Sequence, residues 1–180
     1  ECSCGKYKRM RYKGLVCEKC GVEVTKAKVR RERMGHISLA APVSHIWYSK
    51  GTPNKMALIV GISPKELESV LYFARYIITE SSEPTVKVGK ILTERECKLL
   101  RQQFGNKIEA LMGAEAVLKL LERLELEKLQ VELEAELEDV NSAQKRKKVV
   151  KRLKIVRDFI NSKNKPDWMI LKDVPVIPAD

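Results

Sequence analysis

Four cysteines near the start of the chain carry the clearest chemistry in this sequence. Cys2 and Cys4 form one close pair and, after twelve intervening residues, Cys17 and Cys20 form a second. A structural zinc ion takes four soft ligands at the corners of a tetrahedron, about 2.3 Å from the metal, and two such pairs supply them. We therefore predict a zinc site made by these four thiolates, which leaves no coordination position open for catalysis.

The sequence gives less support to two other uses of the thiols, redox chemistry and disulfide formation. Cys17 and Cys20 form a Cys-x-x-Cys pair, but the pair lacks the βαβ context of thioredoxin-like redox motifs. Disulfides are rare in reducing compartments. The fifth cysteine, Cys97, stands alone and is expected to be a small buried side chain on a helix. His36 and His45 are expected to pack or form hydrogen bonds, because the cysteines already saturate the zinc.

Basic residues surround the cysteines. Residues 1–35 contain eleven lysines and arginines against four acidic residues. Four thiolates with a divalent cation subtract two charges, which leaves a local net charge of about +5. Between the cysteine pairs, cations alternate with Tyr7 and Tyr12, and this pattern predicts a nucleic-acid contact. The candidate contact residues are Lys6, Lys8, Arg9, Arg11 and Lys13.

The basic residues also allow a simpler interpretation. The lysines between the cysteine pairs can merely offset the anionic zinc–thiolate centre and keep it soluble. Arg30, Arg31 and Arg33 leave two interpretations open as well, because closely spaced arginines either grip phosphates or pair with carboxylates of the scaffold. The sequence has no Ser/His/Asp arrangement, no phosphate-cradling glycine loop before a helix and no close acidic cluster for magnesium. We therefore expect no catalytic residue on this segment.

The composition narrows the class of protein. With 180 residues, 44% of them hydrophobic, the chain can bury a core, and its formal charge of +11 favours a polyanionic partner or an acidic protein surface. No stretch approaches the ~20 uninterrupted apolar residues of a membrane helix, and the charged start is unlike a signal peptide. We expect a cytoplasmic protein. Its first residue, Glu1, and its closing segment, 174–180, suggest a fragment of a longer chain.

We predict a small zinc ribbon over 1–35, which positions these residues, and a mainly α-helical scaffold over 36–180. The fold class is α+β overall. Within 36–62 the pattern indicates short strands or extended segments, and Pro42 argues against a central strand. Capping-box sequences at Ser63–Glu66 and Thr93–Glu96 predict helices over about 64–76 and 93–104. The polar stretch between these helices, 81–89, is expected to be a loop.

Two longer helices are predicted over about 114–140 and 143–160. The first has a leucine seam from Leu118 to Leu137, near the three-and-four spacing of a coiled coil. Its residues 115–139 hold nine acids and three bases, whereas residues 145–157 of the second hold eight bases and no acid. An antiparallel helical hairpin would set these opposite charges side by side. Trp47, Tyr72, Phe73 and Trp168 are expected to be core or docking residues.

Several stretches along the chain, including those that hold the cysteines, together form a pattern specific enough to indicate a family. The first three are Glu1–Arg9, Cys17–Thr25 and Val29–Ile37. Shorter motifs continue it to the end: Pro42, His45–Trp47, Leu71–Phe73, Met112–Ala116, Lys145–Lys148 and Lys165–Leu171. Together they resemble the N-terminal zinc-binding region of the beta-prime subunits of bacterial RNA polymerase, and the resemblance covers essentially the whole chain.

The resemblance implies a four-cysteine zinc ribbon near the RNA exit and the upstream DNA, carried on a helical part of the mobile clamp. Cys2, Cys4, Cys17 and Cys20 match the family's ligands one for one. The chain would then be a non-catalytic segment of a nucleotidyltransferase complex that acts in transcription. The catalytic aspartates and Mg²⁺ of the family would lie outside it, and the protein would be bacterial, cytoplasmic and nucleoid-associated.

The implied partners are the beta, alpha and omega subunits, the DNA template, the nascent RNA and, through the complex, sigma and elongation factors, with no membrane. A free-standing zinc-ribbon protein that binds RNA or associates with the ribosome is the alternative function. A small ribbon protein does not need ~110 further scaffold residues, already the size of a domain, so the charged helical hairpin favours the polymerase segment.

Overall fold

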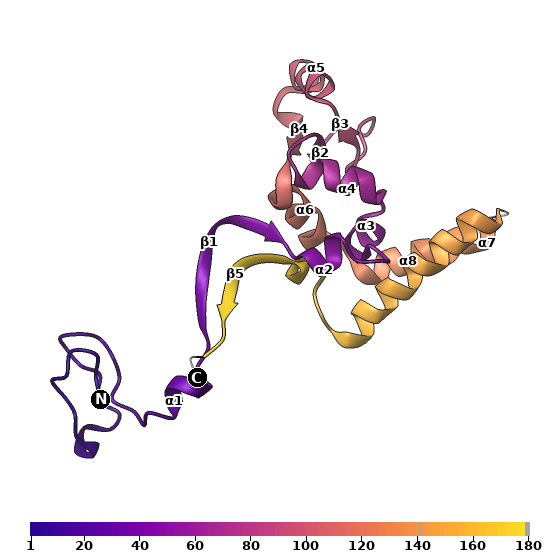
Figure 1. The fold of residues 1–180 in the computed structure, drawn as a ribbon. Helices are drawn as coiled ribbons and strands as arrows, with labels where there is room; N and C mark the ends of the chain where they lie inside the picture. The colour runs from indigo at the N-terminus through magenta and orange to yellow at the C-terminus, as the bar shows by residue number, and fades with distance from the viewer. Residues whose placement is uncertain (141, 179–180) are drawn as a thin grey trace. The chain divides into compact units, whose positions relative to one another are not determined.

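The computed structural model describes residues 1–140 and 142–178, and of these the side chain of Arg30 is outside the description. The chain divides into two compact units (Figure 1). The first comprises Glu1–Ser38 and the segment that begins at Asp173, and the second is Leu39–Lys172. Within the described residues, no helix has the length and apolar character needed to cross a membrane.

The first unit contains little regular structure. A 3₁₀ turn spans Met10–Tyr12, helix α1 spans Val29–Glu32, and an isolated antiparallel bridge joins Val16 to Glu23. Strand β1 (Gly35–Ser44) and strand β5 (Ile170–Val176) each have residues in both units, and they pair in a two-stranded sheet. In a two-stranded sheet each strand keeps one unpaired edge, so β1 accommodates a proline at position 42.

The region 36–62 differs from the extended structure that its sequence predicts. Its first part is strand β1, but α2 (Ile46–Ser49) and α3 (Lys55–Val60) follow. Side-chain caps explain these helices. Nδ1 of His45 accepts a hydrogen bond from the Trp47 backbone N–H at 3.1 Å, and Oδ1 of Asn54 accepts one from the Ala57 N–H at 2.8 Å.

Helix α4 (Pro64–Leu71) begins at the predicted capping box, with Ser63 and Glu66 bonded reciprocally. It ends earlier than the predicted 64–76. Phe73 has a left-handed φ of +60°, and the backbone N–H groups of Ala74 and Arg75 both donate to the carbonyl oxygen of Ser69. This turn reverses the chain, so that the next residues enter a strand and not another helical turn.

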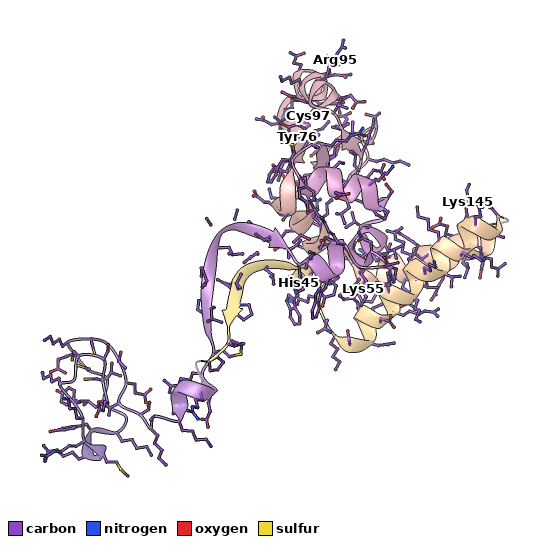
Figure 2. All side chains as sticks on the ribbon, in the orientation of Figure 1. His45, Lys55, Tyr76, Arg95, Cys97 and Lys145 are labelled. Atoms are coloured by element: carbon purple, nitrogen blue, oxygen red, sulfur yellow. The ribbon has the colours of Figure 1, made fainter. Side chains whose placement is uncertain are left out.

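That strand, β2 (Tyr76–Ser81), is the centre of a three-stranded antiparallel sheet. Its neighbours are β3 (Ile91–Leu92) and β4 (Ile108–Leu111). Helix α5 (Glu94–Phe104) starts at the second predicted capping box, and its buried Cys97 joins a small apolar cluster with the sheet (Figure 2). The sequence did not predict these short strands, although the α+β class is confirmed.

The helix predicted over 114–140 is divided into α6 (Gly113–Glu122) and α7 (Leu126–Asp139). Between them, Arg123 turns back to donate from Nη1 to the carbonyl oxygen of Thr79 at 2.9 Å. The leucine seam is therefore shared by two helices, with Leu118 and Leu121 on α6 and the later leucines on α7, and both helices contribute to the main core.

Helix α8 (Ala143–Ser162) runs beside α7 (Figure 1). Leu133 of α7 is buried, as are Val149, Leu153 and Val156 of α8, and all four belong to the main core. An ion pair of 2.8 Å between Arg157 and Glu134 crosses the two helices. Apolar burial, more than the exposed charges, therefore holds α7 against α8.

Replacing Leu133 with Ala should lower the free energy of unfolding of the helical unit by about 2–5 kcal/mol, because the truncation leaves a cavity between α7 and α8. Urea unfolding followed by far-ultraviolet circular dichroism measures the change. Val131→Ala is the matched control on the same helix, since Val131 is 66% exposed, and should stay within about 0.5 kcal/mol of the unsubstituted chain. Equal losses of unfolding free energy in both variants would contradict the packing of Leu133 between α7 and α8.

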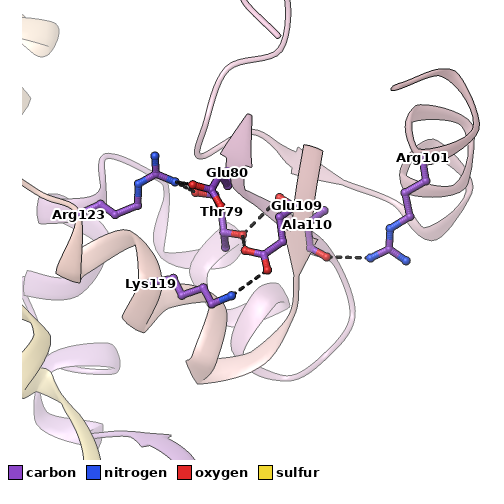
Figure 3. A network of polar contacts seen from close by, with 7 residues as sticks. All are labelled: Thr79, Glu80, Arg101, Glu109, Ala110, Lys119 and Arg123. Atoms are coloured by element: carbon purple, nitrogen blue, oxygen red, sulfur yellow. Dashed lines mark hydrogen bonds and ion pairs between the residues drawn. The ribbon is translucent and has the colours of Figure 1, made fainter. Parts of the chain in front are cut away.

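A polar network fastens the three-stranded sheet to α6 (Figure 3). Glu109 of β4 accepts hydrogen bonds of 2.8 Å from Lys119 Nζ of α6 and from Thr79 Oγ1 of β2. Arg101 of α5 donates from Nη2 to the carbonyl oxygen of Ala110 at 2.9 Å. The Lys119 ammonium, followed by the Thr79 hydroxyl, lowers the pKa of Glu109 below its usual value.

Replacing Lys119 with Met should raise the pKa of Glu109 toward the ordinary glutamate value, as measured by carboxyl NMR titration. A lowered folded-state pKa stabilises the fold above the unfolded-state pKa, and this stability is lost as the pH falls through the folded-state value. The variant should therefore lose less stability on acidification. Lys128→Met is the control, because Lys128 pairs with Glu125 instead. An unchanged Glu109 titration would show that the pairing is ineffective in solution.

Candidate metal centre and basic loop

Two tight turns in the first unit present the four cysteines. In the first turn, Gly5 donates its backbone N–H to the Cys2 carbonyl oxygen at 3.2 Å, and in the second, Gly21 donates to the Cys17 carbonyl oxygen at 2.7 Å. Both glycines have positive φ angles, +76° and +69°, a region that other residues adopt only with strain. The glycine that follows each cysteine pair is therefore part of how the sequence forms the site.

The four sulfur atoms lie together. All lie within 4.8 Å of one another, and the distances from Cys4 Sγ to Cys2 Sγ and to Cys17 Sγ are both 3.6 Å. Sulfur atoms bonded to one tetrahedral zinc at about 2.3 Å lie about 3.8 Å apart, whereas a disulfide joins sulfurs at about 2.05 Å. The thiols are free and close enough to hold a metal ion.

Backbone N–H groups of the turns point at the sulfurs. Tyr7 N–H donates to Cys2 Sγ at 3.3 Å, and the N–H of Val22, followed by that of Cys4, lowers the pKa of Cys20 to about 6. The N–H of Lys6 likewise favours the Cys4 thiolate, but burial and hydrogen bonds among the thiols raise the pKa of Cys4 to about 11. Four anionic sulfurs at this separation repel one another, and a bound cation would offset that repulsion.

The basic segment comprises residues 6–13, and its two tyrosines, Tyr7 and Tyr12, are partly buried beside the cysteines. They pack with Val24, Cys2 and Cys17, and their rings lie 4.9 Å apart with an interplanar angle of 58°. The Tyr7 hydroxyl donates to the Glu18 carboxylate at 3.0 Å. The aromatic rings thus pack against the cysteine cluster, and only part of each ring stays open to solvent.

The five predicted nucleic-acid contacts are all exposed, but they are not equivalent. Lys6 forms an ion pair with Glu18, and this ammonium, with backbone and Tyr7 donors, lowers the pKa of Glu18 to about 2. Arg11 lies over the Tyr12 ring, 4.7 Å from its centroid. Within the described part of the chain, no ion pair involves Lys8, Arg9, Arg11 or Lys13, so their charges face solvent.

Sequence reasoning did not identify Glu18, which lies between the two cysteines of the second pair and neutralises part of the basic segment. Among the arginines that follow, Arg33 lies 3.4 Å from the carboxylate of Glu23, which favours the carboxylate interpretation for that residue. Arg31 is exposed, and the Arg30 side chain lies outside the described residues. His36 is exposed on β1, and His45 caps α2.

The described residues form a mixed α and β chain, in which two glycine turns bring four thiols close enough to hold a metal ion. The chain belongs to the family described as RNA polymerase Rpb1, domain 1, whose model matches residues 1–180.

Similar proteins from bacteria carry the name DNA-directed RNA polymerase subunit beta'. The protein of Fusobacterium nucleatum is 78% identical over 180 residues, which is 100% of this chain and 14% of that protein. The proteins of Symbiobacterium thermophilum and Thermoanaerobacter sp. are 56% and 53% identical, again over 100% of this chain and 15% of each relative. The chain therefore spans about one seventh of the length of these relatives.

Cobalt titration of the reduced, metal-free chain should saturate at one equivalent, with the intense visible and charge-transfer bands of tetrahedral thiolate coordination. Cys17→Ser should weaken the binding strongly, because it removes one of four converging soft ligands. Cys97→Ser is the matched control, since Cys97 is buried on α5 within a separate cluster, and should bind as the unsubstituted chain does. If Cys17→Ser changes neither the stoichiometry nor the spectrum of cobalt binding, the four-cysteine site is contradicted.

Proposed function

We propose that the chain is a non-catalytic segment of the beta-prime subunit of bacterial DNA-directed RNA polymerase, and that it acts in transcription as part of this multi-subunit nucleotidyltransferase. The family match over all 180 residues carries the proposal. The names of the relatives support it. The catalytic Mg²⁺ and its ligands would be held outside the segment.

The alternative, a free-standing RNA-binding or ribosome-associated zinc-ribbon protein, is less favoured, because the match to the polymerase family extends far beyond the cysteine segment. An affinity-tagged intact protein should copurify with the beta, alpha and omega subunits. Its sedimentation with ribosomes, in place of those subunits, would contradict the proposal.

The metal in the proposed function is one structural Zn²⁺, bound by Cys2, Cys4, Cys17 and Cys20 in a zinc ribbon. Four sulfur donors favour zinc over magnesium or calcium, which prefer oxygen ligands. The sulfur separations of 3.6 Å suit a tetrahedral ion. Because four protein ligands complete the coordination, the metal would stabilise the turns and take no part in bond making or breaking.

The proposed role of the basic segment is contact with nucleic acid near the RNA exit and the upstream DNA. Lys8, Arg9, Arg11 and Lys13 are exposed, and phosphates are the natural partners of such cations. Lys6 would contribute less, because it pairs with Glu18. Since both tyrosines are partly buried, we propose that the segment binds the phosphate backbone and does not stack on bases.

The remaining residues would act as a scaffold. We propose a division into a zinc ribbon over 1–35 and a mainly helical clamp scaffold over 36–180, in which α7 and α8 form an antiparallel helical hairpin. The ion pair between Glu134 and Arg157 and the shared buried residues support this hairpin. Sigma and elongation factors would reach the segment through the complex, together with the DNA template and the nascent RNA, in the bacterial cytoplasm at the nucleoid.

Neutralising Lys8, Arg9 and Arg11 to Gln in the intact protein should weaken RNA or DNA binding and reduce its salt dependence. Each lost phosphate contact should lower the slope of log affinity against log salt by about one. Fluorescence anisotropy at a series of salt concentrations measures both quantities.

The matched control for this prediction is Lys6→Gln, which removes the same charge from a lysine that already pairs with Glu18. It should change the slope less than Lys8→Gln does. If none of these substitutions alters the slope, the basic residues keep the segment soluble and do not contact nucleic acid.

A further inference from the structure

A large groove within the second unit is separate from the cysteine cluster. It lies between the end of β1, the α2–α3 connection, α4 and the first half of α8, and encloses about 1130 Å³. Sites for single small molecules usually enclose about 300–1,000 Å³. The groove therefore has room for a segment of polypeptide.

The rim of the groove is strongly basic. Three of its lysines, Lys147, Lys148 and Lys151, lie on α8, whereas Lys65 lies on α4 and Lys50 follows α2. All five are exposed. The one acidic residue in the lining is Glu68, 4.0 Å from Lys50. Lys148 also interacts electrostatically with Glu66, which lies outside the lining. Within the described lining, five lysines accompany one acidic residue, and this excess suits an anionic occupant.

The floor of the groove is apolar. Leu58, Ile62 and Leu71 line it, half buried, and Val43 and Ile46 remain 50% and 61% exposed. Contiguous exposed apolar surface in a soluble protein marks an interaction site, because water contact with it costs free energy that a partner removes. An occupant must therefore bring apolar side chains as well as negative charge.

The apolar floor, more than the two aromatic residues of the groove, argues against nucleic acid as that occupant. Lys50 Nζ lies 5.1 Å from the centre of the Tyr72 ring, and the Phe73 ring lies so close to Gly113 that an added Cβ there would be 2.6 Å away. Both side chains nevertheless stay open to solvent, Tyr72 at 62% and Phe73 at 67%, so the rings alone do not decide the kind of occupant. A duplex would place phosphates on the lysines and leave the apolar floor in water.

We propose that this groove docks an acidic amphipathic helix from a partner protein. Its apolar side chains, spaced three and four residues apart, fill the floor, and its carboxylates face the α8 lysines on one rim and Lys65 on the other. The charge excess of the rim gives the docking its specificity and its association rate, and the apolar floor provides most of its binding energy.

The test uses the intact protein, free of nucleic acid, and fluorescein-labelled synthetic helices observed by anisotropy. One probe carries leucines at i, i+3, i+4 and i+7 with glutamates elsewhere. A second replaces the glutamates with lysines, and a third replaces the leucines with serines. Only the first should bind in the micromolar range, and both replacements should weaken binding at least about tenfold.

Two pairs of variants locate the site. Lys148→Glu should weaken the first probe about tenfold, whereas Lys145→Glu, the same change on α8 outside the groove (Figure 2), should not. Ile46→Ser should weaken it about fivefold, whereas Val131→Ser on α7, also exposed, should not. Ile46 is exposed, so its replacement leaves the core intact.

Two results would overturn the proposal. If the leucine-free acidic probe or a DNA duplex binds as tightly as the first probe, and Ile46→Ser has no effect, the groove is a general anion or nucleic-acid surface. If Lys145→Glu and Lys148→Glu weaken the first probe equally, binding depends on the net charge of α8 and not on the groove.

Discussion

The first unit buries too little apolar surface to hold its own shape. Among its described residues, the buried hydrophobic ones are Cys2, Cys17 and Val24, and two of these three are members of the thiol cluster. Segments of this size need a metal, disulfides or a partner to compensate for the conformational entropy lost on folding. The association of four sulfurs is therefore the constraint on which the order of the turns, the tyrosines and the basic segment depends.

The same constraint explains how charge is distributed around the cluster. Sulfur anions favour nearby cations, yet Lys6 is occupied by Glu18, and the tyrosine rings turn inward to cover the cysteines. Turns that are closed by glycines at positive φ leave the remaining cations on the outside. A segment organised in this way keeps its positive charges at fixed positions without a hydrophobic core beneath them, which suits contact with a polyanion.

Local signals in the sequence predicted a large part of this structure, because they need only neighbouring residues. The cysteine pairs, the capping boxes at Ser63 and Thr93, and the acidic and basic helices are signals of this kind. The ends of α4 and α6 were missed, since Phe73 and Arg123 acquire their conformations from distant contacts: the ring with Gly113, and the guanidinium with Thr79. Strands β2–β4 also depend on pairing between distant segments, which short apolar runs do not reveal.

The two units are therefore stabilised by different forces. In the second unit, helices from distant parts of the sequence share one apolar core, and Arg152 of α8 donates to the carbonyl oxygen of Ile59 at 3.1 Å near the end of α3. All residues of this core belong to the second unit, so the position of α8 and its lysines does not depend on the cysteine cluster. A loss of metal should loosen the turns of the first unit and leave the groove intact, because no groove residue belongs to the first unit. The metal site and the groove can thus be perturbed independently, and each function can be assigned to its own residues.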